Sequence, residues 1–272
     1  MMEITKNDFE TCVSVAVSAH VEVYEKVQPR FDWAFGECRD SVLGDVGAEK
    51  AEEEDNTALA KTVRDWVCLK AFLDVFRQLD LVLTPTGFGV VSTQQMAPAS
   101  KQRVDALVGQ LRDSMLAVHG RLVALLCGVQ GWGETLQAAE NISSLFYDFR
   151  MMKRMVGPSV SHLDWQQAQS LIREADEALR LKLSNEYMDA LLDRVRCRTE
   201  DADDRPVIFL CREITALWIT GEQKAVRMKM RRLLNMLDAD PEKYPIYREF
   251  GYPVNHHETY QNTEDSPAFF FG

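Results

Sequence analysis

The residues of this chain that could do chemistry are few and widely spaced. Gly87-Phe88-Gly89 lacks the third glycine of a dinucleotide-binding loop and the GK[ST] ending of a P-loop. The chain has no HExxH or GxSxG motif and no cysteine–histidine pair at a recognised catalytic spacing. His256-His257-Glu258 could attract a metal ion, but adjacent histidines in an extended segment diverge, which favours a solvated pair. We therefore expect no catalytic residue, no cofactor and no metal site.

The six cysteines are spread along the chain without a CxxC pair. They are Cys12, Cys38, Cys68, Cys127, Cys197 and Cys211. A zinc site needs clustered ligands, and a disulfide scaffold is short and dense in cysteine, so this spacing favours reduced thiols used as small apolar residues. The consecutive carboxylates of residues 52–55 point in different directions on any regular backbone. We interpret them as a solvated loop or the fraying end of a helix rather than a metal site.

The segment from residue 222 to 237 concentrates positive charge in a chain whose net charge is −11. Its cations, set against one carboxylate, are Lys224, Arg227, Lys229, Arg231 and Arg232. Such a helix could meet the acidic surface of a neighbouring subunit, DNA or phospholipid, or it could be a solvated polar face. Among the partners, subunit contact is favoured, because residues 37–55 carry eight carboxylates against two basic residues. Nucleic acid is not expected to bind the acidic chain, except incidentally through this helix.

Apolar residues recur at steps of three and four over most of the chain, which predicts helices. The predicted stripes cover residues 9–27, 59–79, 104–126, 142–152, 165–183, 188–195, 207–218 and 226–237. Ser100 and Ser161 are placed to cap two of these helices, a break is expected at Ser184-Asn185, and Pro206 suits a first turn. His20 on the first stripe is interpreted as structural. Residues 37–55 show no helical stripe.

Two segments depart from the helical pattern. Leu81-Val82-Leu83 and Phe88–Ser92 are β-prone runs around a Pro-Gly turn, which predicts a β-hairpin over residues 81–92. An isolated hairpin is only marginally stable, so this one must pack on helices or on another molecule. After Pro241 the sequence is typical of an extended, aromatic-rich arm, and its three consecutive phenylalanines must be buried on the same chain or on a neighbour. The candidate interface residues are Phe88, Val90, Val91, Lys224, Arg227, Arg231, Phe269, Phe270 and Phe271.

The fold class is therefore mainly α, a multi-helix bundle with one small β-hairpin and an extended C-terminal tail. We expect an N-terminal helical subdomain over 1–133 that carries the hairpin, a C-terminal helical subdomain over 134–240, and an arm over 241–272. No signal peptide is visible, and no apolar run approaches the ~20 residues of a membrane span. Neither export nor a membrane partner is expected.

Two blocks carry a resemblance to a known family. The block from Leu79 to Ser92, LDLVLTPTGFGVVS, with residues 97–104, APASKQRV, resembles an uncharacterised, DUF6712-like family encoded in phages and prophages of gut bacteria. The ending from Asp265 to Gly272, DSPAFFFG, is similar to that of the family. The family has no established catalytic residues to carry over to this chain.

The resemblance implies a component of virion morphogenesis, a head–tail connector or adaptor without enzymatic activity. Its partners would be further copies of the chain and other virion proteins, in the host cytoplasm during assembly and afterwards in the virion. One alternative is a prophage-encoded cytoplasmic protein-binding module that regulates a host protein. Another is an enzyme with an unfamiliar helical site, against which the missing motifs argue.

Overall fold

The structure is a computed structural model that describes residues 3–14, 22–53, 57–79, 81–84, 87–90 and 100–251. This part of the chain is mainly helical, as predicted. The α-helices are α1 (Lys6–Cys12), α2 (Glu22–Val27), α3 (Phe31–Cys38), α4 (Gly44–Glu53), α5 (Ala58–Val75), α6 (Lys101–Leu126), α7 (Leu136–Asn141), α8 (Phe149–Met155), α9 (His162–Leu183), α10 (Asn185–Cys197), α11 (Asp204–Ile219) and α12 (Gln223–Ala239). Short 3-10 helices are η2 (Gln28–Arg30), η4 (Phe76–Gln78), η5 (Trp132–Glu134) and η6 (Pro241–Lys243), and π-helices are η3 (Arg39–Leu43) and η7 (Tyr247–Gly251).

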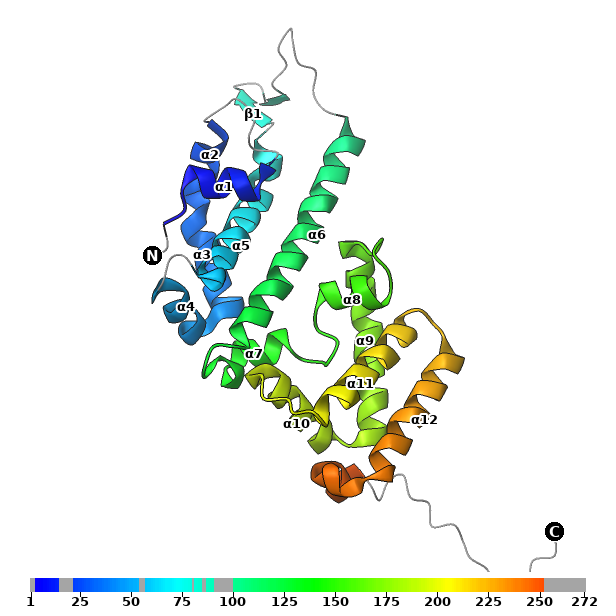
Figure 1. Cartoon of the computed structure of the whole chain (residues 1–272). Helices are drawn as coiled ribbons and strands as arrows, with labels where there is room; N and C mark the ends of the chain where they lie inside the picture. The colour runs from blue at the N-terminus through cyan, green and yellow to red at the C-terminus, as the bar shows by residue number, and fades with distance from the viewer. Residues whose placement is uncertain are drawn as a thin grey trace, which may run out of the picture.

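The long helix α6 lies between two groups of helices (Figure 1). On one side it packs along α5, around which α1 and α3 gather, and on the other it contacts α8 and α9. Helix α11 packs against both α9 and α12. One hydrophobic core runs from Phe9 to Tyr247 through both groups, and a smaller core surrounds Phe149. Because the main core is continuous, the two groups share their buried surface.

The helix starts follow the caps that the sequence predicts. The Ser100 hydroxyl accepts a hydrogen bond from the Arg103 amide at 3.4 Å and begins α6. Ser161 and Asp164 form a reciprocal capping box at the start of α9. The break at Ser184 is confirmed: its φ of 89° ends α9, and its hydroxyl caps α10.

The stripe predicted for residues 142–152 is not one helix. α7 ends at Asn141, and α8 begins only at Phe149, capped by the Asp148 carboxylate. In the connection between α7 and α8, side chains from α10 and α11 hydrogen-bond to backbone carbonyls. Arg196 donates to the carbonyl of Ile142 at 2.8 Å, and Arg212 donates to that of Leu145 at 2.9 Å. The apolar residues are buried as expected, but on a non-helical connection.

Residues 37–53, for which the sequence shows no helical stripe, are nevertheless helical and continue from α3 through η3 into α4. The face that α4 buries consists of small residues, Gly47, Ala48 and Ala51, which leave almost no hydropathy signal. A Cβ on Gly47 would lie 2.8 Å from Leu126 Cδ2, so the small residue lets α4 approach α6 closely. Glu54 and Asp55 lie outside the described residues.

The predicted first helix over 9–27 and the predicted arm over 241–272 also need correction. α1 ends at Cys12, and residues 15–21, which include His20, lie outside the described residues. Residues 241–251 are not extended but fold into η6 and η7 on the helical body. Tyr247 is buried there, its ring centroid 5.8 Å from that of Tyr187, and its hydroxyl donates to Asp238 at 2.8 Å. The remainder of the arm, 252–272, lies outside the described residues.

The stretch expected to form a hairpin is described only in part. The backbones of β1 (Leu81–Thr84) and β2 (Gly87–Val90) pair antiparallel, with Leu81 opposite Val90 and Thr84 opposite Gly87. The turn residues 85–86, Val91 and the side chains of both strands lie outside what the structure describes. What this element packs against therefore stays a prediction.

Candidate interaction surfaces and central cleft

Helix α12 presents a row of cations to solvent. It follows a turn at Gly221, where φ is 76°, and buries Val226, Leu233 and Leu237, so the opposite face is exposed. That face carries the basic stripe, defined here as Lys224, Arg227, Arg231 and Arg232. None of the four has an ion-pair partner in the described part of the chain, whereas Lys229, beside them, pairs with Glu213 at 2.7 Å. The structure thus brings together three sequence-predicted interface residues, Lys224, Arg227 and Arg231.

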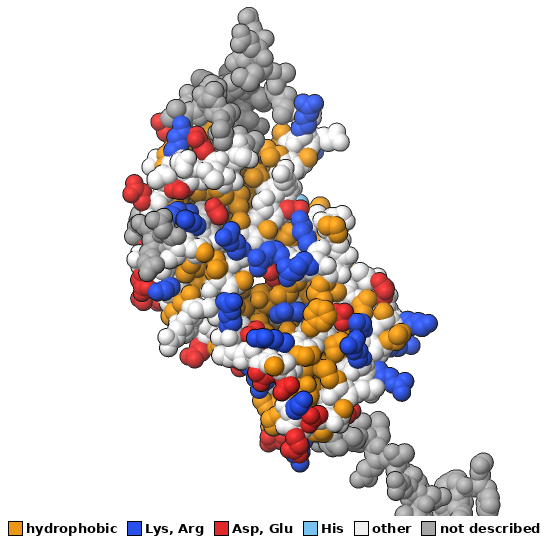
Figure 2. Space-filling model, in the orientation of Figure 1, with side chains coloured by type: hydrophobic (Ala, Val, Ile, Leu, Met, Phe, Trp, Pro, Cys, Tyr) orange, Lys and Arg blue, Asp and Glu red, His pale blue; other side chains and the backbone are white. Residues whose placement is uncertain are grey.

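Carboxylates dominate the surface of the segment that runs from the end of α3 to α4. The acidic face is defined here as its exposed carboxylates, Glu37, Asp40, Asp45, Glu49, Glu52 and Glu53. The two cations of this segment are already neutralised, Arg39 by Asp45 at 2.6 Å and Lys50 by Glu53. Figure 1 shows α4 and α12 at opposite sides of the molecule, and Figure 2 shows Lys and Arg side chains along the side that α12 forms. The two charged surfaces therefore face away from each other.

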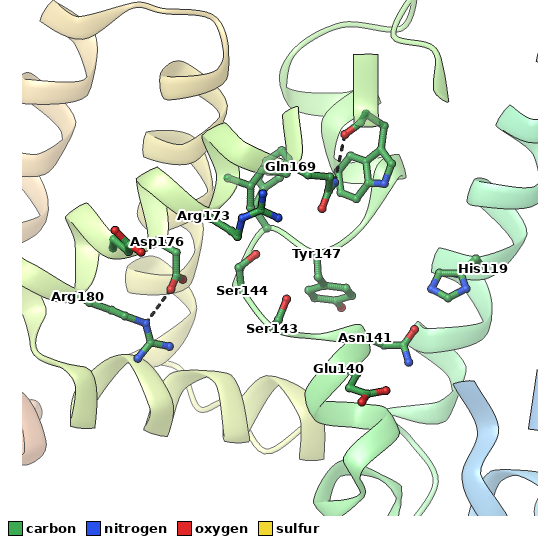
Figure 3. Close-up of a pocket in the computed structure, with 14 residues that line it drawn as sticks. His119, Glu140, Asn141, Ser143, Ser144, Tyr147, Gln169, Arg173, Asp176 and Arg180 are labelled. Carbon is green, nitrogen blue, oxygen red and sulfur yellow. Dashed lines mark hydrogen bonds and ion pairs between the residues drawn. The ribbon is translucent and has the colours of Figure 1, made fainter. Parts of the chain in front are cut away.

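An open cleft of about 550 Å³ separates α6 and the α7–α8 connection from α9. His119 and Tyr147 line one wall, and Gln169, Arg173 and Arg180 line the other (Figure 3). Arg180 is held in place, because its Nε lies 2.7 Å from Asp176 and its Nη1 lies 2.7 Å from Asp189. The cleft is thus built from three separate parts of the chain.

Burial shifts the pKa values of His119 and Tyr147 in the cleft wall so that both favour their uncharged forms. Burial lowers the pKa of His119, opposed by the nearby Asp148 carboxylate and a hydrogen bond with Asn141. Burial also raises the pKa of Tyr147 to about 12. At neutral pH both side chains can exchange hydrogen bonds with a polar group without carrying charge. Sequence reasoning missed both, since they come from different elements and belong to no motif.

Of the sequence-predicted interface residues and cysteines that the structure describes, none lines this cleft. Phe269, Phe270 and Phe271, like His256 and His257, lie outside the described residues. Cys38, Cys68, Cys127 and Cys211 are buried free thiols, as predicted for small apolar residues, whereas Cys197 is exposed. In the described ranges no group of three or more His, Cys, Asp or Glu side chains could hold a metal ion. Nor does any helix in those ranges combine the length and apolarity needed to cross a membrane.

The described part of the chain is thus mainly helical, with two oppositely charged surfaces and an open cleft at its centre. Residues 40–142 match the model of a family described as a family of unknown function, DUF6712. The resemblance inferred from the sequence is confirmed over this segment, which runs from η3 to just past α7. No curated protein and no solved structure matches the chain.

Proposed function

We propose that this chain is a non-enzymatic structural protein of a phage or prophage particle, a head–tail connector or adaptor that acts through homo-oligomerisation. It works with further copies of itself and with other virion proteins, in the host cytoplasm during assembly and then in the virion. The phage context rests on the family resemblance. The oligomeric mode of action rests on the distribution of charge.

The observation that carries the proposal is the placement of the basic stripe and the acidic face on opposite sides of the molecule. In the described part of the chain, the four cations of the stripe have no ion-pair partner. They complement a face of six carboxylates, three of which (Glu37, Asp45 and Glu53) already pair with a cation of this chain, so the stripe of one copy suits the acidic face of the next. A contact between two different surfaces of the same chain is heterologous, and it generates a closed ring or an open filament. A connector needs a ring.

Apolar side chains beside the basic stripe also suit it to contact with a protein. Met228 lies among the cations of α12 and is 65% exposed. Arg227 and Arg231 line a shallow groove together with Trp218 and Met230. The arginine side chains can lay their apolar stems on such a surface while their guanidinium groups reach carboxylates bidentately. The same side of α12 therefore offers both charge and apolar area to a neighbour.

A charge-swap experiment tests the proposal. Lys224→Glu/Arg227→Glu/Arg231→Glu reverses the stripe, and Asp40→Lys/Glu49→Lys reverses part of the acidic face. Size-exclusion chromatography with light scattering should show oligomers for the wild-type chain, loss of oligomers for each variant alone, and mixed oligomers when the two variants are combined. The wild-type association should also weaken as salt screens the charges.

The matched control is Lys61→Glu/Arg112→Glu/Arg205→Glu, which makes the same change in net charge at exposed positions outside both surfaces. It should associate like the wild-type chain. A wild-type chain that remains monomeric at low salt and high concentration, with or without purified portal protein, would refute the oligomeric role. Mass spectrometry of purified particles tests the virion location.

A second candidate function is a cytoplasmic protein-binding module or regulator encoded by a prophage. The central cleft favours it, because His119, Tyr147 and Arg173 present hydrogen-bonding groups in an open space that can admit a polar side chain. Affinity purification from induced cells distinguishes the two functions. Recovery of one host protein in place of virion proteins, lost on Tyr147→Phe/Arg173→Ala, would favour the regulator.

A further inference from the structure

A second groove, of about 590 Å³, lies between α8 and α11 and reaches the first half of α12. Its apolar lining consists of Met151, Met155, Val156, Phe209, Ala216 and Leu217. Phe209 lines this groove and is 56% exposed, so its ring is accessible to a ligand in the groove. Aromatic side chains at apolar grooves are typical anchors of protein contacts.

The charged residues of the groove leave two cations without an ion pair. Five charged side chains line it: Arg154, Arg212, Glu213, Glu222 and Lys229. Lys229 and Glu213 pair with each other, but in the described part of the chain neither Arg154 nor Arg212 has a carboxylate partner. Arg212 donates from Nε to the carbonyl of Leu145.

Of the two cations, Arg212 is the one whose pKa is lowered by burial. It is partly buried, and Tyr147 and the Glu200 carboxylate oppose this lowering of the pKa of its guanidinium group. A partly desolvated guanidinium with no carboxylate in ion-pair contact is costly, and a ligand that brings a carboxylate relieves the cost through charge-assisted hydrogen bonds. The groove is therefore suited to a peptide that joins aromatic side chains to carboxylates.

The chain itself contains a segment of that chemistry. Residues 264–271, EDSPAFFF, place two carboxylates four to seven residues before three consecutive phenylalanines. They belong to the 21 residues that follow Gly251, which can span roughly 70 Å at about 3.3 Å per extended residue. Such a length reaches a neighbouring molecule. Burial of each phenylalanine contributes on the order of 1.5–3 kcal/mol.

We propose that the groove between α8 and α11 binds residues 264–271 of a second copy of this chain. The inference rests on the proposed function and names a second contact within the same assembly. α12 contributes both the basic stripe and, through Glu222 and Lys229, part of the groove wall. The groove therefore adjoins the surface that faces the next copy, where that copy's aromatic segment can reach it. Phe209 contacts the phenylalanines, and Arg212 and Arg154 receive the carboxylates.

Photo-cross-linking in the full chain tests this contact. Phe270 is replaced by a photoreactive phenylalanine analogue, isotopically labelled and unlabelled copies are mixed, and cross-linked peptides are identified by mass spectrometry. The expected products join residue 270 of one copy to peptides of α8 or α11 that carry the other isotope label. Cross-links confined to a single copy would overturn the exchange between copies, and cross-links elsewhere, or none, would overturn the groove as the site.

Two variants sharpen the test. Phe209→Glu places a carboxylate opposite the acidic segment and should reduce the cross-link yield by about ten-fold, as expected for a lost aromatic anchor. Leu181→Glu changes a residue that is 73% exposed on α9, outside the groove, and should leave the yield unchanged. Circular dichroism checks that both variants fold.

The outcomes separate this inference from the proposed function. Oligomers that respond to charge reversal on α12 but give cross-links outside the groove would overturn the groove contact and leave the oligomeric role standing. Groove cross-links between copies that persist when the stripe is reversed would support the contact made here and would count against the charge pairing proposed above.

Discussion

Gly120 and Asp148 lie so close that a Cβ on Gly120 would stand 2.1 Å from Asp148 Oδ1. Arg150 stabilises the same contact, since it pairs with the Asp148 carboxylate and donates from Nη2 to the Gly120 carbonyl at 2.7 Å. Asp148 in turn caps α8 by accepting from the Arg150 amide at 2.9 Å. This contact fixes the start of α8 against the middle of α6, and thus positions the wall of the central cleft that carries Tyr147.

Replacing Gly120 by alanine should destabilise the protein by about 2–3 kcal/mol, because a buried, hydrogen-bonded carboxylate has little room to yield. The measurement is the free energy of unfolding in urea. Gly36→Ala is the matched control: nothing lies within 4 Å of its Cβ position in α3, so it should stabilise the helix by about 0.5–1 kcal/mol. Equal effects of the two substitutions would contradict the packing described for Gly120.

The stability should depend on the protonation of His119. Burial lowers its pKa in the folded state below the ordinary value of 6.5, so the unfolded chain takes up a proton at higher pH than the folded one. This contribution to stability is fully present above pH 6.5 and is lost as the pH falls through the folded-state pKa. An NMR titration of the His119 imidazole should give a midpoint below 6.5, and His119→Gln should flatten the decline in unfolding free energy over that window. A midpoint at or above 6.5 would refute the burial effect.

The ion pair between Arg194 and Asp204 should contribute to stability where the surface pairs do not. Asp204 is only 2% exposed at the start of α11, and Arg194 is its cationic partner. Arg194→Met leaves a buried carboxylate without that partner and should cost about 2–3 kcal/mol, less than for a fully buried pair because Arg194 still meets solvent. Arg39→Met breaks the exposed pair with Asp45 and should leave the unfolding free energy nearly unchanged, because solvent screens this pair.

Cys197 should be the thiol that reacts fastest with an aromatic disulfide reagent in the folded protein. It is exposed, whereas burial raises the pKa of Cys12 to about 12 and that of Cys127 to about 11. The absorbance trace should show one rapid equivalent of reacted thiol, which Cys197→Ser removes and Cys127→Ser retains. Several rapid equivalents in the native chain would mean that the buried cysteines are more accessible than the structure indicates.

The elements that could be predicted are those whose signals are local. Ser100 and Ser161 mark helix starts because each hydroxyl accepts a hydrogen bond from a backbone amide, three residues further on, that has no partner within the helix. The basic stripe could be predicted because Lys224, Arg227 and Arg231 recur at helical spacing on a helix that is amphipathic by itself.

What could not be predicted depends on contacts between distant residues. The apolar spacing of residues 142–148 is typical of a helix, but the structure has none there. The carbonyls of Ile142 and Leu145 instead accept hydrogen bonds from Arg196 and Arg212, which belong to α10 and α11. α4 buries glycine and alanine, whose small area gives no periodic signal. Tertiary packing places His119 across the cleft from α9, and no sequence motif indicates this arrangement.

The contacts around Trp132 limit where this chain can be recombined with another. The Trp132 indole donates to the Val42 carbonyl at 3.0 Å, and a Cβ on the neighbouring Gly133 would lie 2.7 Å from the Arg196 carbonyl. The Arg196 side chain donates to the carbonyl of Ile142, the residue at which the family match ends. The segment 40–142 is consequently not an exchangeable module. Another polypeptide that carried it would need its own counterpart of α10, and a recombination junction at residue 142 would separate the Arg196 guanidinium from the Ile142 carbonyl.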